Sequence, residues 1–186
     1  MRTFEWPIEE IATAHAGLYL DHCAVMAAAM MSRLSASPCE FLVECEGFQP
    51  PRLEGESRFL LRVSWSRRTA QAAKRVWRAE QPKPVVERAA VALAALVYGR
   101  LIPGGRLRVT DEGESADFWL PRLQSALEIS GTQRREALPD RHREKVAQVL
   151  ANPRKWNGFV FICCFDTTHR LIRWSYHVWE ERHAQS

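Results

Sequence analysis

The feature that most constrains the fold is a run of eight residues at 158–165, with the sequence GFVFICCF. Seven are apolar and the first is glycine, and polar residues flank the run on both sides. A short segment rich in aromatic and β-branched residues predicts a strand that is buried on both faces. A sheet built around such a strand needs cover on both sides. We therefore expect an α/β (α+β) protein with a mixed central sheet flanked by helices.

The segments around this run predict its neighbours. Residues 171–179 alternate apolar and polar side chains, which predicts a strand paired with the run around a turn at Asp166–Thr168. Residues 141–151 (RHREKVAQVLA) are typical of an amphipathic helix, and residues 85–98 (VVERAAVALAALVY) of a buried central helix. Between these helices the sequence predicts a turn at Asp111 to Ser115 and three short strands, at 106–110, 116–120 and 126–130.

The N-terminal part of the chain is expected to elaborate this core. Pro7 followed by two glutamates predicts a helix that runs to about Met31, with Gly17 as a candidate break. Two strands at 41–45 and 59–65 and a helix at 68–80 follow. The prolines of Pro82-Lys83-Pro84 mark the expected boundary. We expect a helix, hairpin, helix region at 1–81, packed on the core or separate from it, and an α-β-β-β-α-β core at 82–186.

Cysteine usage and hydropathy bear on the compartment. The five cysteines are an odd number without a CxxC pair, which favours a reducing environment over a disulfide framework or a zinc site. The longest apolar stretch near the N-terminus, Cys23 to Met31, is far shorter than the roughly 20 residues that span a bilayer. We expect a cytoplasmic protein without a membrane partner.

Positive charge is concentrated in one part of the chain. Between Arg62 and Arg88 there are eight Lys or Arg residues, against only Glu80 and Glu87. Such a cluster is typical either of a solvated helix face or of a surface that neutralises phosphates. The candidate residues for nucleic-acid binding are Arg67, Arg68, Lys74, Arg75 and Arg78.

Two acidic residues fall on neighbouring predicted strands of the core, Asp117 on the second and Glu128 on the third. The order helix, three strands, helix, strand over residues 85–179, with acids at these places, resembles the PD-(D/E)XK (restriction-endonuclease-like) nuclease superfamily. The resemblance implies a Mg²⁺ site formed by Asp117, Glu128 and the main-chain carbonyl of Ile129. Mg²⁺ prefers oxygen ligands, and it would promote attack of water on a phosphodiester.

The sequence departs from that family at one important position. The family signature places a lysine two residues after the third-strand acid, where this chain has Ser130. Serine cannot supply a positive charge, so we nominate Lys145 on the following helix for this role. Glu87 resembles an auxiliary acid of some members, although an acid in the first helical turn also suits the helix dipole. Asp117 can also be read as a solvated acid near a turn, Glu128 as a charge on an edge strand, and Lys145 as an ordinary surface lysine.

Three functions remain open at this stage. The first is a subunit of a nucleic-acid-processing or defence complex that has the nuclease-like fold in a catalytically degenerate form, which the missing signature lysine favours. The second is an active Mg²⁺-dependent DNA or RNA endonuclease that uses Asp117 and Glu128. The third is a protein-binding module of the antitoxin or immunity type. Nucleic acid, a protein partner or a second copy of the chain are the partners these functions imply.

Overall fold

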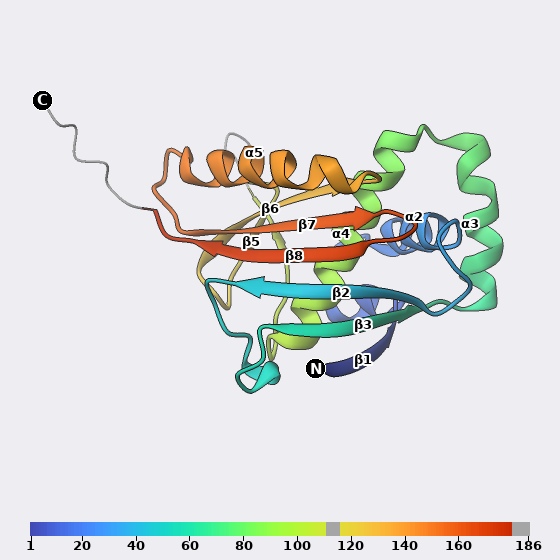
Figure 1. Cartoon of the computed structure of the whole chain (residues 1–186), viewed down its shortest axis with the longest axis horizontal. Helices are drawn as coiled ribbons and strands as arrows, with labels where there is room; N and C mark the ends of the chain where they lie inside the picture. Colours follow the sequence, from blue (N-terminus) through green and yellow to red (C-terminus); the bar gives the residue numbers. More distant parts are fainter. Residues whose placement is uncertain (111–115, 180–186) are drawn as a thin grey trace, which may run out of the picture.

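All strands of the chain belong to one mixed sheet. The computed structural model describes residues 1–110 and 116–179, and its eight strands follow the order β1-β3-β2-β8-β7-β6-β5-β4 (Figure 1). The strands are β1 (Arg2–Pro7), β2 (Cys39–Glu46), β3 (Arg58–Ser64), β4 (Arg108–Val109), β5 (Phe118–Leu120), β6 (Ser125–Thr132), β7 (Gly158–Phe165) and β8 (Arg170–His177). The α-helices are α1 (Glu10–Ala14), α2 (Asp21–Met31), α3 (Arg67–Ala79), α4 (Pro82–Leu101) and α5 (Leu138–Leu150). The predicted α/β class with a mixed sheet is confirmed.

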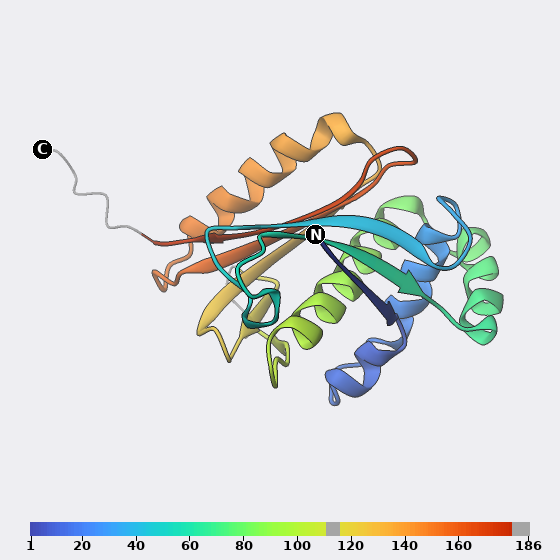
Figure 2. The same cartoon turned by 60° about the horizontal axis from the view of Figure 1, so that its bottom comes forward.

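Helices cover the two faces of the sheet unequally. Helices α1 to α4 lie on one face, and α5 lies alone on the other (Figure 2). Strand β7 is buried throughout because its odd-numbered residues, such as Phe159 and Phe161, pack toward α4, whereas Val160 and Ile162 pack against α5. The prediction of a strand buried on both faces is therefore confirmed. Helix α4 is buried along most of its length, as its apolar sequence predicts.

The strands of the C-terminal half place the candidate residues near one another. Strands β4, β5 and β6 form an antiparallel meander, and β6 then connects through α5 to β7, which pairs with β6 in parallel. Strand β8 pairs with β7 antiparallel. The chain thus runs α4, β4, β5, β6, α5, β7, so that α5 crosses over the β6–β7 pair. The turn predicted at Asp111 to Ser115 lies outside the described residues.

The N-terminal region differs from the prediction in its first element. Residues 2–7 form strand β1, paired in parallel with β3, and not the approach to a helix. Phe4 and Trp6 alternate with exposed Thr3 and Glu5, and both aromatic rings pack near Phe59 of β3, which stabilises a strand. The helix expected up to Met31 is divided into α1 and α2, as the candidate break at Gly17 predicts. The chain between them has Gly17 at φ +102°, a left-handed conformation that suits glycine.

Strands from the N-terminal region continue the sheet of the core. Strand β2 pairs antiparallel with β3 and parallel with β8, so residues 1–81 contribute three strands to the same sheet. Helices α3 and α4 are separated only by Glu80 and Gln81, beside the predicted boundary. Helix α5 begins at Leu138, earlier than predicted, because a short 3-10 turn at Arg135–Ala137 leads into it. No helix in the described part of the chain has the length and apolarity needed to cross a bilayer.

Candidate functional site

Asp117, directly before strand β5, lies beside Glu128 of strand β6. Because β5 and β6 are antiparallel and Phe118 pairs with Leu127, Asp117 lies opposite Glu128. The backbone N–H of Ile129 donates a hydrogen bond of 2.7 Å to Oδ2 of Asp117. The side chain of Asp117 thus accepts a backbone hydrogen bond from β6, directly before β5 begins. The prediction that Asp117 lies within a strand is wrong. Its carboxylate is held against β6 by the main chain.

Lys145 brings its charge to both carboxylates. Its Nζ lies 2.5 Å from Oε2 of Glu128 and 3.6 Å from Oδ2 of Asp117. Glu128 points to the face of the sheet that α5 covers, and its side chain is only 5% exposed, whereas that of Asp117 is 42% exposed. The structure therefore brings together three predicted site residues: Asp117 beside β5, Glu128 of β6 and Lys145 of α5.

Burial sets the protonation of this cluster. Burial and the negative charge of Asp117 raise the pKa of Glu128 above its usual value, against the opposing effect of the hydrogen bond from Lys145. Burial alone would lower the pKa of Lys145, but its hydrogen bond to Glu128 and the charge of Asp117 raise it overall. The pair thus favours the charged form of Lys145, while burial favours the protonated form of Glu128 more than in an exposed glutamate.

The donor set suits a hard cation such as Mg²⁺. The N–H and C=O groups of one strand residue point to the same side, and the N–H of Ile129 is directed at Asp117, so the carbonyl of Ile129 faces the same acid. Two carboxylates and a carbonyl are ligands that Mg²⁺ accepts together with water molecules. No group of three His, Cys, Asp or Glu side chains that could hold an ion exists among residues 1–110 and 116–179. A metal here would therefore rest on two side chains and one main-chain oxygen.

A hollow of about 480 Å³ opens beside Asp117 and Lys145, and Glu128 is not part of its lining. Asp117, Ile129 and Lys145 line it, and so do the auxiliary candidates Glu87 and Ser130. An adjoining hollow of about 370 Å³ extends it past the start of α4. The two hollows share four lining residues, which are Lys83, Glu87, Ser130 and Arg141.

Close packing of α4 on β6 positions Glu87 at this hollow. A Cβ atom at Gly131 would lie 2.7 Å from both Cγ1 and the carbonyl oxygen of Val86. Only glycine lets the backbone of α4 approach β6 this closely. The side chain of Glu87, next to Val86, is 55% exposed, and it lies 4.0 Å from Nζ of Lys83. Glu87 thus lies at the rim of the hollow and is not grouped with Asp117 and Glu128.

The predicted nucleic-acid-binding residues lie elsewhere. Arg67, Arg68, Lys74, Arg75 and Arg78 are all exposed on α3, which packs on α2 on the face of the sheet opposite α5. None of these five forms an ion pair within the described part of the chain, which agrees with a solvated basic face. They do not line the hollow at Asp117.

Other cations surround the cluster instead. Lys83 and Arg88 belong to the basic stretch between Arg62 and Arg88 but not to its five named candidates, and Arg141 was not expected near the acids. Lys83 and Arg88 come from the first half of α4, and Arg141 comes from α5, one turn before Lys145. The four-residue spacing of Arg141 and Lys145 was a usable signal, because such residues share a helix face. Arg141 pairs with Glu144 at 3.2 Å, and Arg88 with Glu80 at 3.6 Å. These pairs hold the arginines at the rim.

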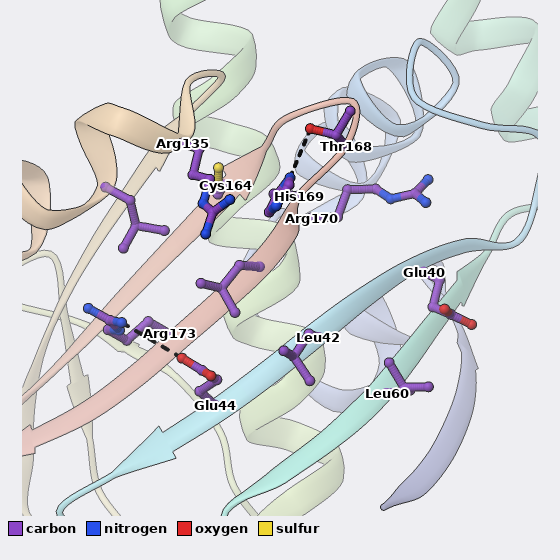
Figure 3. A pocket seen from close by; sticks show the side chains of 12 residues that line it. Glu40, Leu42, Glu44, Leu60, Arg135, Cys164, Thr168, His169, Arg170 and Arg173 are labelled. Carbon is purple, nitrogen blue, oxygen red and sulfur yellow. Dashed lines mark hydrogen bonds and ion pairs between the residues drawn. The ribbon is translucent and has the colours of Figure 1, made fainter.

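A separate hollow of about 540 Å³ lies on the face of the sheet that carries α5, next to that helix (Figure 3). It lies over the part of β2 and β3 that no helix covers on this face. Its apolar lining is formed by Leu42, Leu60, Leu138, Cys164 and Leu171. Arg173 also lines it, and pairs with Glu44 at 3.7 Å and with Glu46 at 3.1 Å. None of the predicted site residues lines this hollow.

Scans against protein-family models, curated proteins and solved structures found no match to this chain.

Proposed function

We propose that this chain is a metal-dependent phosphodiesterase that cleaves nucleic acid at the cluster of Asp117, Glu128 and Lys145. The observation that carries the proposal is the position of the Lys145 ammonium, within 3.6 Å of both carboxylates. A lysine beside two acids supplies the charge that a serine at position 130 cannot supply. This arrangement supports the superfamily resemblance without the signature lysine in its usual place.

Each residue of the cluster has a distinct role in the proposed reaction. Asp117, Glu128 and the carbonyl of Ile129 would hold a Mg²⁺ ion, which would stabilise negative charge on the phosphate and lower the pKa of water. Lys145 would orient the attacking water and stabilise the charge that develops on the phosphate oxygens. The main-chain hydrogen bond from Ile129 fixes Asp117, so the site is largely preorganised.

Nucleic acid is the proposed substrate because cations line the approach to the cluster. Lys83, Arg88 and Arg141 lie on the rim of the hollow, where they can contact phosphates on either side of the one that reacts. Binding through such contacts should weaken as salt concentration rises, since phosphate neutralisation releases counterions. The five basic residues of α3 form a second basic face on the far side of the sheet.

Cleavage assays test the proposal. Wild-type protein is incubated with single- and double-stranded DNA and RNA in Mg²⁺, in Mn²⁺ and in EDTA. We expect metal-dependent cleavage that falls by roughly 10²-fold or more in Asp117→Asn and in Lys145→Met. Asp140→Asn is the matched control, because Asp140 is an exposed aspartate on α5, paired with Arg143, away from the cluster. Equal cleavage by Asp117→Asn and the control would refute the proposal.

A second candidate function is a non-catalytic subunit of a nucleic-acid-processing complex. The observation that favours it is the burial of Glu128, whose carboxylate is already engaged by Lys145. In this case the pair is a structural contact and the basic rim binds nucleic acid without cleaving it. Retention of metal-independent binding by wild type, without cleavage in either metal, would support this function.

A further inference from the structure

Three of the seven tryptophans gather near the C-terminal end of α5. The rings of Trp119 in β5 and Trp156, just before β7, have centroids 4.6 Å apart at an interplanar angle of 51°. The backbone of Trp179 bonds to Asn157 at 2.8 Å, beside Trp156. All three side chains are half-buried, and none belongs to either hydrophobic core cluster. These rings therefore contribute a partly exposed aromatic surface.

This surface lies on the same face of the sheet as the candidate site. Trp119 follows Asp117 by two residues, so both side chains project toward the α5 side of the sheet. The register places Trp119 opposite Ala126, just as Asp117 lies opposite Glu128. Two residues along a strand span about 7 Å. Trp119 is therefore adjacent to the proposed reacting phosphate, without another side chain of β5 on that face between them.

The loop that carries Trp156 is built to hold the ring in place. Asn152 is 5% exposed, and its side-chain amide donates to the carbonyl oxygens of Val149 and Trp156, at 2.5 and 2.9 Å. Its Oδ1 accepts a 2.9 Å bond from the N–H of Trp156. A buried asparagine thus connects the end of α5 to both polar groups of the Trp156 backbone, and so holds the backbone from which the ring reaches Trp119.

Cations accompany these rings. The guanidinium of Arg154 lies 5.5 Å from the centroid of the Trp156 ring, and Nζ of Lys155 lies 4.9 Å from that of Trp179. Aromatic faces flanked by Lys or Arg are the combination that binds single-stranded nucleic acid, because the rings stack on bases and the cations contact phosphates.

We infer that Trp119 and Trp156 form a stacking platform for an unpaired base next to the phosphate at Asp117, and that the substrate is therefore single-stranded or locally unpaired nucleic acid. The inference rests on the proposed function for the identity of the reacting phosphate. Bases in a duplex are stacked on one another, so a duplex offers its phosphates but no free base face to these rings.

Tryptophan fluorescence and binding titrations test the platform without cleavage. Wild-type protein in EDTA is titrated with a single-stranded dT oligonucleotide and with a duplex of equal length. We expect quenching by the single strand, and about tenfold weaker binding of it in Trp119→Ala and Trp156→Ala, equivalent to about 1.4 kcal/mol. Trp119→Phe retains an aromatic face and should bind nearly as wild type. Trp65→Ala, which changes a half-buried tryptophan remote from Asp117, is the matched control.

The outcomes separate the platform from the nuclease activity. Unchanged affinity in both alanine variants, or an equal loss in Trp65→Ala, overturns the platform even if Asp117→Asn abolishes cleavage. Loss of affinity confined to Trp119→Ala and Trp156→Ala, with no cleavage by wild type in any metal, supports the platform and rejects the nuclease. If Trp119→Ala does not fold, the affinity of Trp156→Ala and the quenching of wild type still test the platform. Trp156 lies in a loop, so its replacement is expected to leave the fold intact.

Discussion

Removing the ammonium of Lys145 should destabilise the protein in a pH-dependent way. In Lys145→Met, the carboxylate of Glu128, 5% exposed, loses the cation 2.5 Å away and keeps only like charge from Asp117 nearby. Leaving one partner of a buried pair uncompensated costs about 3–5 kcal/mol. For a chain of this size that corresponds to a fall in Tm of about 10 °C. The full loss is expected at pH 8, where Glu128 must be ionised or must take up a proton at a cost.

The loss of stability in Lys145→Met should be larger at high pH than at low pH. A carboxyl whose pKa is raised in the folded state favours folding when protonated, and it opposes folding as pH rises above the unfolded-state pKa. At pH 5 the unpaired Glu128 is protonated, so the loss in Lys145→Met should shrink to roughly 1 kcal/mol of lost packing.

Urea unfolding followed by circular dichroism at pH 5 and pH 8 measures both values. Lys74→Met on α3 is the control, because this exposed lysine has no ion pair in the described part of the chain, and its effect should stay within about 0.5 kcal/mol at either pH. Equal losses in Lys145→Met at the two pH values would refute the account of Glu128 as an unpaired buried acid.

Two further predictions concern the packing on either side of the sheet. Gly131→Ala should lower stability by about 1–3 kcal/mol in urea unfolding, because the new Cβ would lie 2.7 Å from Val86 and α4 would have to shift. The contribution of His142 and His177 to stability should also fall as pH drops below about 6.5, because burial lowers the pKa of both histidines, which share hydrogen bonds of 2.7 and 2.8 Å with the Ser175 hydroxyl. The difference in unfolding midpoint between pH 7 and pH 5 should be smaller in His142→Gln; an unchanged difference would contradict this assignment.

Elements with a strong intrinsic pattern could be predicted from the sequence. Strand β7 and helix α4 were placed correctly because a long apolar run leaves few alternatives. Strand β1 was missed because Pro7 and the acids after it resemble a helix start, and only its parallel pairing with β3 stabilises the strand. That pairing joins residues more than fifty positions apart, which local patterns do not reveal.

The candidate site was predictable where its residues follow from strand order. Asp117 and Glu128 were expected on neighbouring strands, and the helix after them was expected to carry a cation. From α4 only Glu87 was expected near the acids. The nearby Lys83 and Arg88 were not, because a helix that is apolar almost all round does not show which end approaches the acids. Trp119 and Trp156 were missed for a similar reason, since Trp156 lies in a loop whose position depends on the buried amide of Asn152.

Stability and activity of one double variant together distinguish a functional ion pair from a structural one. Replacing both members of a buried pair by neutral groups of similar volume is often neutral or stabilising. Glu128→Gln with Lys145→Met should therefore recover most of the stability that Lys145→Met alone loses, because no buried charge remains unpaired. If the double variant is as stable as wild type but does not cleave, the pair is dispensable for the fold and required for the chemistry. This is expected of an active site, where charges are kept buried for activity at a cost in stability. If the double variant is instead as unstable as Lys145→Met, the pair stabilises the fold directly, and the non-catalytic subunit becomes the better interpretation.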